Sequence, residues 1–404
     1  MTHRTKALER FILVAGLAIA GTAAAQITVT KSAKSENPTL YISAFAGAPE
    51  ASELLRNGIG YCGWFDIVTT PSADYHLSGT YRQTGGDRVV EITVSDAGGR
   101  PVSRFSQQST AAERKLLIYS AVDELIRRLF NNPGFCTSRL AYVKELEGRK
   151  EIWLADFDGD NPEQLTHNNS LSVEPDWGVD NRHLVYTAYQ RHAMDIVLVD
   201  MRTHRQRRLT QFPGLNSGAA FANSGHYAAV TLTHEQQVDL FIIDLETGKL
   251  QQLTDNRGLE ASPCWSPDDR KICFVSNEHS RRPTLFLVPS RGGRSKRLLR
   301  QTLECVSPDW SAVSNRVCCA VRRGGRYTIG LVEMRGKGRK LDILVDAPGD
   351  WESPSWAADG RHIVCTRNFD GRKSLYLVDT LNGRIVQLKN FTGDDSLPSY
   401  SGRF

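Results

Sequence analysis

Three aspartates in the segment DFDGDN alternate with other residues, as the first ligands of a calcium loop do. They are Asp156, Asp158 and Asp160. A calcium loop would also need a distal bidentate glutamate, and corresponding segments at 244–248 and 379–383 have the composition of ordinary turns. Asp and Asn favour such turns because their side chains bond to nearby backbone N–H groups. We therefore interpret the three aspartates as turn residues and predict no metal site.

Side chains that commonly perform nucleophilic or acid–base catalysis form no known motif here. Ser217 and Ser224 each stand beside one glycine but lack the second flanking glycine of a nucleophile elbow. Neither a His-Glu-x-x-His pattern nor a phosphate-binding loop occurs. The ten histidines are scattered, and those in repeated turns, such as His183, His226 and His362, are expected to be exposed. The sequence therefore offers no catalytic constellation, and we predict no cofactor.

The eight cysteines are of interest because disulfides form mainly in exported proteins. Half of them lie in apolar runs with strand character: Cys273, Cys318, Cys319 and Cys365. Packed sheets stand about 10 Å apart, beyond the reach of a disulfide, so we expect these four to be small core residues. Two pairings remain open, Cys264 with Cys273 across one hairpin and Cys62 with Cys136 near the start. No cysteine spacing resembles a zinc site.

An aromatic residue returns at nearly constant intervals through most of the chain. The spacings are 44, 44, 45, 46 and 44 residues, between Trp177, Phe221, Trp265, Trp310, Trp356 and Tyr400. The surrounding segments are also similar, for example SPCWSPDDRKICFVS from Ser262 and SPSWAADGRHIVCTR from Ser353. A fixed period of this length indicates a repeat architecture.

Each repeat contains the pattern of four short strands. Seven residues after each of the first five aromatics, a run of three apolar residues begins, such as Ile272, Cys273 and Phe274, which is typical of a strand buried on both faces. A third apolar run, a turn that usually contains Asp, and a fourth strand follow. Four antiparallel strands in about 45 residues indicate a propeller blade. The first unit lacks its aromatic strand, so we expect Tyr400 to complete it and to close a six-bladed ring.

The residues before the repeats have a different organisation. Arg4, Lys6 and Arg10 precede an apolar run and three alanines, which indicates an export signal over residues 1–25. The apolar run is too short to span a bilayer permanently, so we expect a soluble, exported protein. Residues 26–136 are predicted to form a small α/β domain, and residues 137–404 the propeller. The expected strands of the α/β domain are 39–45, 65–69, 75–82, 89–95 and 100–106, and its expected helices are 48–57 and 111–130. The predicted fold class is mainly β, a six-bladed β-propeller preceded by a small α/β domain.

The charge of the chain is mildly basic. The formal net charge is +5, and removing a leader with Arg4, Lys6, Arg10 and Glu9 subtracts 2 and leaves +3. This balance is too small to indicate nucleic acid as a partner. Basic residues gather at 202–208, 291–297 and 335–340. We interpret these clusters as solvated turns in preference to a rim that faces acidic polymers of the envelope.

Two regions remain as candidates for binding. Segments that lead into the aromatic strands are expected to converge on one face of the ring, where a rigid scaffold positions loops for binding; the alternative is that they only connect the blades. The segment QITVTKSAKSEN at 26–37 has only Ile27 and Val29 as apolar residues. It is expected either to be disordered or to add a strand to a partner's sheet.

The chain resembles the TolB family of the Tol-Pal system. The motif Pro-Cys-Trp-Ser-Pro-Asp from Pro263 is shared with that family, although prolyl oligopeptidase and tricorn-type propellers also contain it. The order of export signal, α/β domain and six blades is similar as well, as are residues 55–57, 65–66 and 135–161. The resemblance covers nearly the whole chain after the leader.

The resemblance implies a function. It implies a monomeric periplasmic scaffold, not an enzyme, which supports envelope integrity and cell division and associates with the envelope through its partners. Those partners would be a Pal-like peptidoglycan-associated lipoprotein and a TolA-like inner-membrane protein. The Pal-like surface would comprise Glu174, Leu215, Asn216, Ser217, Gly218, Arg257, Glu260, Ala261, Ser262, Ser307, Glu352 and Ser353. The TolA-like segment would comprise Gln26, Ile27, Thr28, Val29 and Thr30. Leu215 and Ala261 depart from the His and Thr that the family often has there.

Two other functions are compatible with a propeller. A propeller of the prolyl oligopeptidase type accompanies a catalytic α/β domain, which a separate subunit would have to supply here. A ligand-binding or lyase propeller would need clustered histidines or metal ligands in its channel, and the sequence gives no sign of them.

Overall fold

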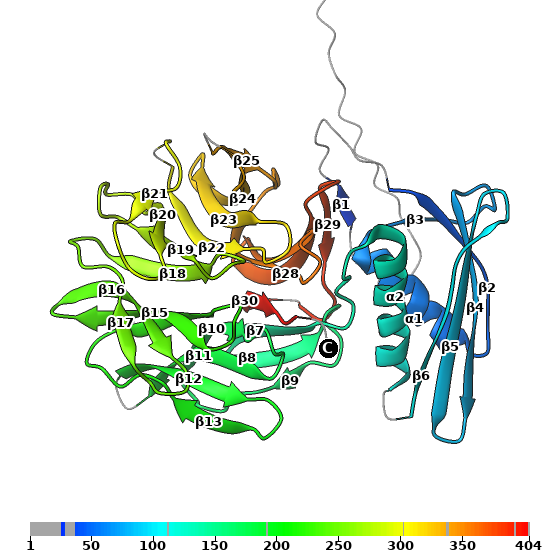
Figure 1. Ribbon diagram of the computed structural model, residues 1–404, viewed down its shortest axis with the longest axis horizontal. Helices are drawn as coiled ribbons and strands as arrows, with labels where there is room; N and C mark the ends of the chain where they lie inside the picture. Colours follow the sequence, from blue (N-terminus) through cyan, green and yellow to red (C-terminus); the bar gives the residue numbers. More distant parts are fainter. Residues whose placement is uncertain are drawn as a thin grey trace, which may run out of the picture.

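The computed structural model describes residues 26–28, 37–110, 113–190, 193–301, 303–336, 339–391 and 393–402. The predicted export signal at 1–25 lies outside these residues, as do Val29 and Thr30 of the predicted TolA-like segment. Within the described ranges the chain forms an α/β domain beside a ring of small antiparallel sheets (Figure 1). The predicted fold class, a six-bladed β-propeller preceded by a small α/β domain, is confirmed.

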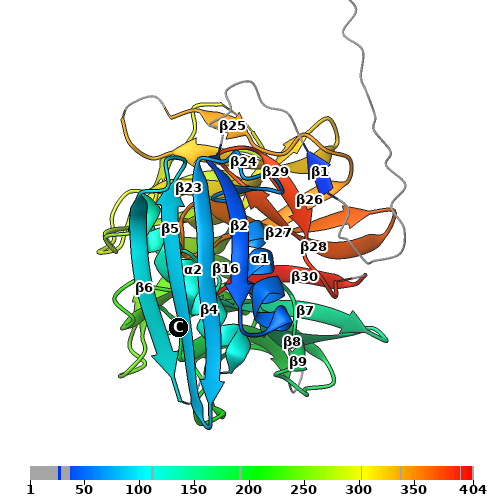
Figure 2. The ribbon, with the colours of Figure 1, turned by 90° about the vertical axis from the view of Figure 1, so that its right-hand side faces the viewer.

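The α/β domain is a five-stranded sheet covered on one face by two helices. Its strand order is β3-β2-β4-β5-β6. The bounds are β2 Thr39–Ala46, β3 Asp66–Val68, β4 Tyr75–Thr84, β5 Asp87–Asp96, β6 Pro101–Ser109, α1 Pro49–Cys62 and α2 Arg114–Phe130. Both helices lie between the sheet and the propeller in Figure 1, and Figure 2 looks onto the sheet with the helices behind it. The helices therefore form the contact layer between the two parts of the molecule.

The sequence of α1 explains its position in this layer. Its buried residues Ala51, Leu55, Ile59 and Cys62 recur every three or four positions and so form one face of the helix. Gly63 ends the helix in the left-handed conformation, with φ 61°, and its N–H donates to the carbonyl of Ile59 at 3.2 Å. The helix is longer than the predicted 48–57 because the periodic apolar face continues to Cys62.

Six four-stranded blades form the ring. The first contains β30 Asp395–Tyr400, β7 Arg139–Leu146, β8 Arg149–Asp156 and β9 Glu163–Gln164, and the second β10 Leu171–Trp177, β11 His183–Gln190, β12 Ala193–Asp200 and β13 Arg205–Arg208. The third contains β14 Asn216–Phe221, β15 Tyr227–His234, β16 Gln237–Asp244 and β17 Leu250–Gln252, and the fourth β18 Glu260–Trp265, β19 Lys271–Ser276, β20 Thr284–Pro289 and β21 Lys296–Arg297. The fifth contains β22 Cys305–Trp310, β23 Arg316–Arg323, β24 Arg326–Glu333 and β25 Leu341–Ile343, and the sixth β26 Asp350–Trp356, β27 His362–Phe369, β28 Arg372–Asp379 and β29 Arg384–Gln387.

The last strand closes the ring as predicted. Strand β30 pairs antiparallel with β7, and Tyr400 lies opposite Leu140. The hydroxyl of Tyr400 also donates to the carbonyl of Phe157 at 2.7 Å. The first blade is thus built from both ends of the propeller, which joins the first and last parts of the repeat without a covalent bond.

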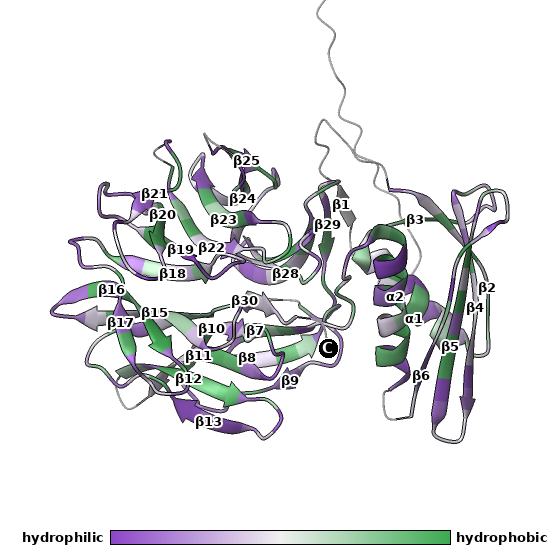
Figure 3. Cartoon of the chain, in the orientation of Figure 1, coloured by the Kyte–Doolittle hydropathy of each residue, from purple (hydrophilic) through white to green (hydrophobic). Residues whose placement is uncertain are grey.

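The blades pack face to face through their middle strands. In β19 the five residues 272–276 are all buried, and in β27 residues 362–366 are. The outermost strand β13 is mainly arginine and is drawn in the hydrophilic colour in Figure 3. The prediction of strands buried on both faces is therefore confirmed, and polarity rises toward the rim of the ring.

Each innermost strand contains a bulge at the same place. The pairing register of all six shifts by one step between the first and last pairs of the strand. One residue in each bulge has positive φ, between 48° and 63°: Glu174, Gly218, Ser262, Ser307, Ser353 and Leu397. Only Gly218 adopts this conformation without steric cost. Bulges bend a strand and redirect its side chains, so these residues turn toward the axis of the ring.

The amino-terminal segment lies on the propeller itself. Strand β1, Gln26–Thr28, pairs antiparallel with the outer edge strand β29, with Ile27 opposite Ile385. These three residues extend the sixth blade, so the expectation of disorder is wrong for them. Strand addition to a partner's sheet stays a prediction for this segment.

The remaining expectations on cysteines and membranes can be compared with the described residues. All eight cysteines are buried and unbridged. Cys273, Cys318, Cys319 and Cys365 are core residues of the blades, as predicted. Neither α1 nor α2 combines the length and apolar composition that a membrane-crossing helix requires.

Candidate functional site: the channel face of the propeller

A small cavity opens along the axis of the ring. It has a volume of about 170 Å³ and is lined by the middle residues of all six innermost strands. The lining repeats the motif of the sequence and includes Glu174, Pro175, Asp176, Gly218, Ser262, Pro263, Ser307, Pro308, Asp309, Ser353, Pro354, Leu397 and Pro398. The same bulge in each blade therefore builds a ring of small residues and prolines around the axis.

Glu174 connects two neighbouring blades at this cavity. Its Oε2 accepts hydrogen bonds from the hydroxyl of Thr187 and from the N–H of Gly218, each at 2.9 Å. Gly218 belongs to the next blade, so the carboxylate fixes the relative position of two bulges. Glu174 is half-buried and still faces the cavity. It is both a structural link and a group that a ligand at the axis would contact.

Two aspartates that the site prediction missed also line this cavity. Asp176 accepts from the N–H of Phe221 at 2.9 Å, and Asp309 accepts from the N–H of Trp356 at 2.7 Å. Burial raises the pKa of Asp176 to about 7 and that of Asp309 to about 6, and the charge of Asp309 raises the pKa of Asp176 further. The channel therefore gains negative charge as the pH rises toward neutrality. Each of the two directly precedes the Trp of its repeat, and this position was the signal in the sequence that could have identified them.

The side of the ring on which the innermost strands begin is called the channel face. Its outer part exposes several of the predicted residues. Arg257 and Ala261 are exposed, while Leu215, Gly218 and Ser262 are partly exposed. Ser307, Glu352 and Ser353 are partly exposed as well. Near them, Leu259 is 58% exposed and Phe212 is 42% exposed. The segments before the third and fourth blades thus offer apolar side chains beside a basic one, and sequence reasoning had not named Phe212 or Leu259.

Three predicted contact residues are buried instead. Asn216 is 0% exposed, and its side chain donates to the carbonyls of Phe212 and Gly214 at 2.7 and 3.3 Å. Ser217 is 9% exposed and lies 3.3 Å from the hydroxyl of Thr231. These two residues shape the loop from inside, so direct contact with a partner is corrected to a positioning role.

Glu260 needs the same correction. It is 1% exposed, and its Oε1 accepts from the amide of Asn256 at 3.1 Å and from the hydroxyl of Ser276 at 3.0 Å. Burial raises its pKa to about 7. The carboxyl group holds the loop over residues 256–260 in place, and it leaves Leu259 and Ala261 on its two sides exposed.

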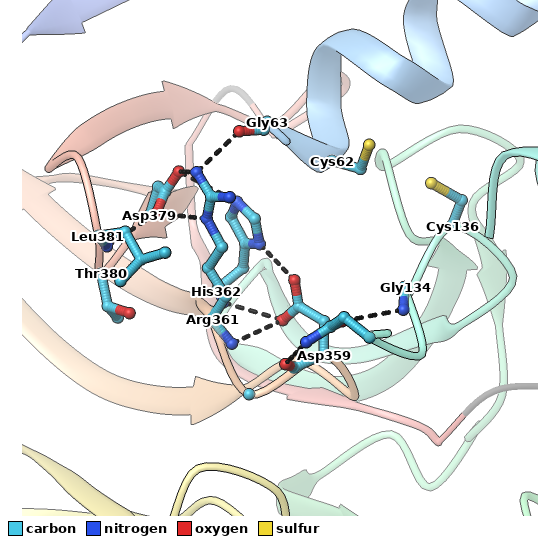
Figure 4. A network of polar contacts seen from close by, with 12 residues as sticks. Cys62, Gly63, Gly134, Cys136, Asp359, Arg361, His362, Asp379, Thr380 and Leu381 are labelled. Atoms are coloured by element: carbon cyan, nitrogen blue, oxygen red, sulfur yellow. Dashed lines mark hydrogen bonds and ion pairs between the residues drawn. The ribbon is translucent and has the colours of Figure 1, made fainter. Parts of the chain in front are cut away.

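The opposite ends of the blades carry a charged network at the contact with the α/β domain (Figure 4). Arg361 binds Asp379 through two nitrogens, at 2.9 and 2.6 Å, and donates to the carbonyl of Gly63 at 2.8 Å. It also stacks over the ring of Trp64, with 4.6 Å between the guanidinium carbon and the ring centroid. Since Gly63 and Trp64 follow α1 directly, the arginine joins the sixth blade to the end of that helix.

His362 belongs to this network, which corrects the expectation that it is exposed. It is 1% exposed, and its Nδ1 lies 2.6 Å from Asp359 and its Nε2 3.6 Å from Asp379. Burial by itself lowers the pKa of this histidine, but the two carboxylates outweigh burial and raise it to about 9. His183 is partly exposed and His226 is exposed. A repeated turn becomes buried only where the α/β domain covers it.

The three aspartates of DFDGDN also lie at this contact. The Nζ of Lys115, from α2, is 2.8 Å from Asp156, 3.2 Å from Asp158 and 3.0 Å from Asp160. The hydroxyl of Tyr119 donates to Asp158 at 2.8 Å. In the described ranges, no three His, Cys, Asp or Glu side chains are grouped as ligands of a metal ion. A single ammonium group of the same chain thus pairs with all three carboxylates of this turn and joins α2 to the first blade.

The fold and the ring of loops define a class of protein: a six-bladed β-propeller with an α/β domain attached to one side. The family model of the TolB beta propeller domain matches residues 126–403. The Tol-Pal system protein TolB of Desulfosudis oleivorans is 25% identical over 194 residues, 48% of this chain and 43% of that protein. The protein TolB homolog of Chlorobium luteolum is 24% identical over 276 residues, 63% of each chain. The chain therefore spans less than two thirds of the length of these relatives.

A solved structure extends the likeness of fold to the α/β domain. The crystal structure of TolB from Acinetobacter baumannii has a TM-score of 0.83 with this chain at 19% sequence identity. The match covers 94% of this chain and 100% of that chain. The chain belongs to the TolB family.

Proposed function

We propose that this chain is the TolB-like component of a Tol-Pal system, acting in the periplasm as a scaffold without catalytic activity. The observation that carries the proposal is the family match over residues 126–403, since relatives in the comparison are named as Tol-Pal system proteins. The channel face supports it. Loops from a rigid ring present partly exposed small and apolar residues, which is how scaffolds commonly bind protein partners.

A Pal-like lipoprotein is the proposed partner of the channel face. The contact surface comprises the exposed members of the predicted set, Arg257 and Ala261, together with Leu259 and Phe212. Leu215, Gly218, Ser262, Ser307, Glu352 and Ser353 line its inner edge, and Glu174 lies at the cavity. Asn216, Ser217 and Glu260 position these loops from below. An exposed apolar patch beside a positive charge suits a protein surface with an apolar centre and an acidic rim.

A TolA-like inner-membrane protein is the proposed partner of the segment at Gln26, Ile27, Thr28, Val29 and Thr30. Strand addition uses backbone groups of an edge strand. In Gln26–Thr28 one side of the backbone is paired with β29. A partner must therefore either pair with the free side of β1 or replace β29.

Binding to the channel face is tested by substituting residues that are exposed and not part of the fold. A purified Pal-like lipoprotein domain should bind the wild type. The double variant Leu259→Asp, Ala261→Arg should reduce the affinity at least about tenfold, because it places at the centre of the patch two charged groups that would lose their hydration on binding. The measurement is isothermal titration calorimetry, with the melting temperature as a check on folding.

The matched control is Val313→Arg. Val313 is 53% exposed and lies between β22 and β23, at the opposite ends of the innermost strands. This variant should bind like the wild type. Full affinity of the double variant, or equal loss in both, would count against the assigned face.

Deletion of residues 26–34 should leave this affinity unchanged while removing binding to a TolA-like domain. Screening with peptide and glycan substrates should detect no turnover.

A further inference from the structure

Cysteine side chains in this chain are neighbours in three places. The thiol of Cys136 interacts with Cys62, that of Cys264 with Cys273, and that of Cys319 with Cys305. All six side chains are buried, as are those of Cys318 and Cys365. The geometry of each pair decides whether a disulfide fits there.

The pair in the fourth blade has unsuitable geometry. Cys264 and Cys273 are directly opposite in the β18–β19 ladder. Ser266 donates its N–H to the carbonyl of Lys271 at 2.9 Å, so these two residues form a hydrogen-bonded pair. Because hydrogen-bonded and non-hydrogen-bonded pairs alternate, Cys264 and Cys273 are also a hydrogen-bonded pair. Their Cβ atoms are then about 5.5 Å apart, whereas a disulfide needs about 3.5–4.5 Å.

The pair in the fifth blade is separated further. Cys305 lies opposite Val321 in the β22–β23 ladder. Cys319 is two residues away from Val321, so it is the diagonal neighbour of Cys305. Diagonal neighbours are about 7–8 Å apart. A bridge there would require the strands to move, and the packed blades on both sides resist such movement.

The pair at the α/β domain is not held in a strand ladder. Cys62 is the last residue of α1, and Cys136 lies in the irregular segment between α2 and β7. The Sγ of Cys62 is 3.2 Å from the carbonyl oxygen of Ile59, and the Sγ of Cys136 is 3.7 Å from that of Gly58. The two thiols thus lie against the carbonyl groups of two consecutive residues in one helical turn. Figure 4 shows the side chain of Cys136 extending toward Cys62.

We propose that Cys62 and Cys136 form a disulfide when the chain folds under oxidising conditions, and that the other six cysteines remain thiols. In the cell this inference rests on the proposed periplasmic location. The backbone at Cys136 and Thr137 already donates to Asp123 of α2, at 2.8 and 3.0 Å. The disulfide adds a covalent link from the same segment to α1, so that both helices of the contact layer hold the chain where it enters the propeller.

The chemistry is an exchange with a disulfide-bearing oxidant, such as oxidised glutathione. One protein thiolate attacks a sulfur of the oxidant, which breaks its S–S bond and releases one thiol. The second thiolate attacks the protein sulfur of the mixed disulfide, forms the Cys62–Cys136 bond and releases the second thiol. Two protein thiols are oxidised, one external disulfide is reduced, and the two protons pass to the released thiolates. Since both cysteines are buried, the exchange takes place before folding is complete.

The test refolds the full purified chain in a mixture of reduced and oxidised glutathione, so it does not depend on export. Free thiols are then alkylated under denaturing conditions without reductant, and the peptides are mapped by mass spectrometry. We expect a linked pair of peptides containing Cys62 and Cys136, and alkylation of the other six cysteines. Alkylation of Cys62 and Cys136 in the refolded protein, or a bridge between other cysteines, would overturn the proposal.

A thermal measurement gives an independent result. The oxidised wild type should melt several degrees above protein refolded with reductant, because the bridge closes a long loop in the unfolded chain. The variant Cys62→Ala, Cys136→Ala should show no such difference, whereas Cys264→Ala, Cys273→Ala should keep it. Equal melting temperatures for oxidised and reduced wild type would contradict the proposed link. Loss of the Pal-like interaction with an intact bridge would instead argue against the proposed function alone.

Discussion

The two sides of the propeller are built from the same repeat but have opposite chemistry. At the contact with the α/β domain, the charged groups Arg361 and Asp379 are buried and paired, and the half-buried Lys115 is paired as well. On the channel face, the beginning of β18 exposes Leu259 and Ala261, and Glu260 between them is buried. The difference indicates that one side maintains the architecture and the other is available for a partner. Substitutions on the first should change stability, and substitutions on the second should change binding.

Removing the closing strand should have the largest effect on the first side. Deletion of residues 397–404 removes the pairing of Tyr400 with Leu140 and its hydrogen bond to Phe157. It exposes both the edge of β7 and the apolar cluster that contains Tyr400. We expect loss of a single cooperative transition in denaturant-induced unfolding, followed by circular dichroism. A truncated chain with an unchanged melting temperature would disprove the importance of this closure.

Substitution of Arg361 should have the next largest effect. The change Arg361→Met keeps the length of the side chain but leaves buried Asp379 without its bidentate partner, with His362 Nε2 at 3.6 Å as its remaining ion pair among the described residues. Loss of one partner of a buried ion pair typically costs about 3–5 kcal/mol. The free energy of unfolding from denaturant titration is the measurement. The exposed Arg335→Met serves as the control and should change stability by less than about 0.5 kcal/mol.

A smaller effect should appear as a pH dependence of stability. The pKa of His362 is raised from its ordinary value of 6.5 to about 9. The folded state therefore binds this proton more tightly than the unfolded state does, so the stabilisation is complete below pH 6.5 and is lost as the pH rises through 9. Melting temperatures between pH 6 and pH 10 should fall for the wild type over this window, and His362→Gln should lack that part of the fall.

The comparison with the channel face provides a control for this experiment. Burial raises the pKa of Asp176 from 3.8 to about 7. Its contribution is complete below pH 3.8 and is lost as the pH rises through 7, so it ends before that of His362 does. Asp176→Asn keeps an acceptor for the N–H of Phe221, and in a melting-temperature series extended down to pH 4 it should remove only the part of the pH dependence below about pH 7. If both variants changed the same pH range, the two sides of the ring would not be electrostatically distinct.

The sequence predicted the repeated elements well because they depend on local patterns. The aromatic period and the apolar runs such as 272–274 arise from the strands themselves, so the blades, the closure by Tyr400 and most of the α/β domain followed from them. The roles of single loop residues did not follow. Asn216 and Glu260 occupy the same repeated segments as Ala261, yet two turn inward to bind backbone and side-chain groups and one remains exposed.

The sequence by itself determined that the chain is a ring of six similar sheets, because a period of this length and a strand pattern within it have few structural solutions. Only the tertiary structure decided which copies of a repeated turn became buried or paired. His362 is buried, whereas His226 in an equivalent turn is exposed, and Asp158 pairs with Lys115. His362 and Asp158 both lie at the side that the α/β domain covers, as does the contact between Cys62 and Cys136. The physical reason is that burial and pairing depend on residues far away in the chain, which a local pattern does not contain.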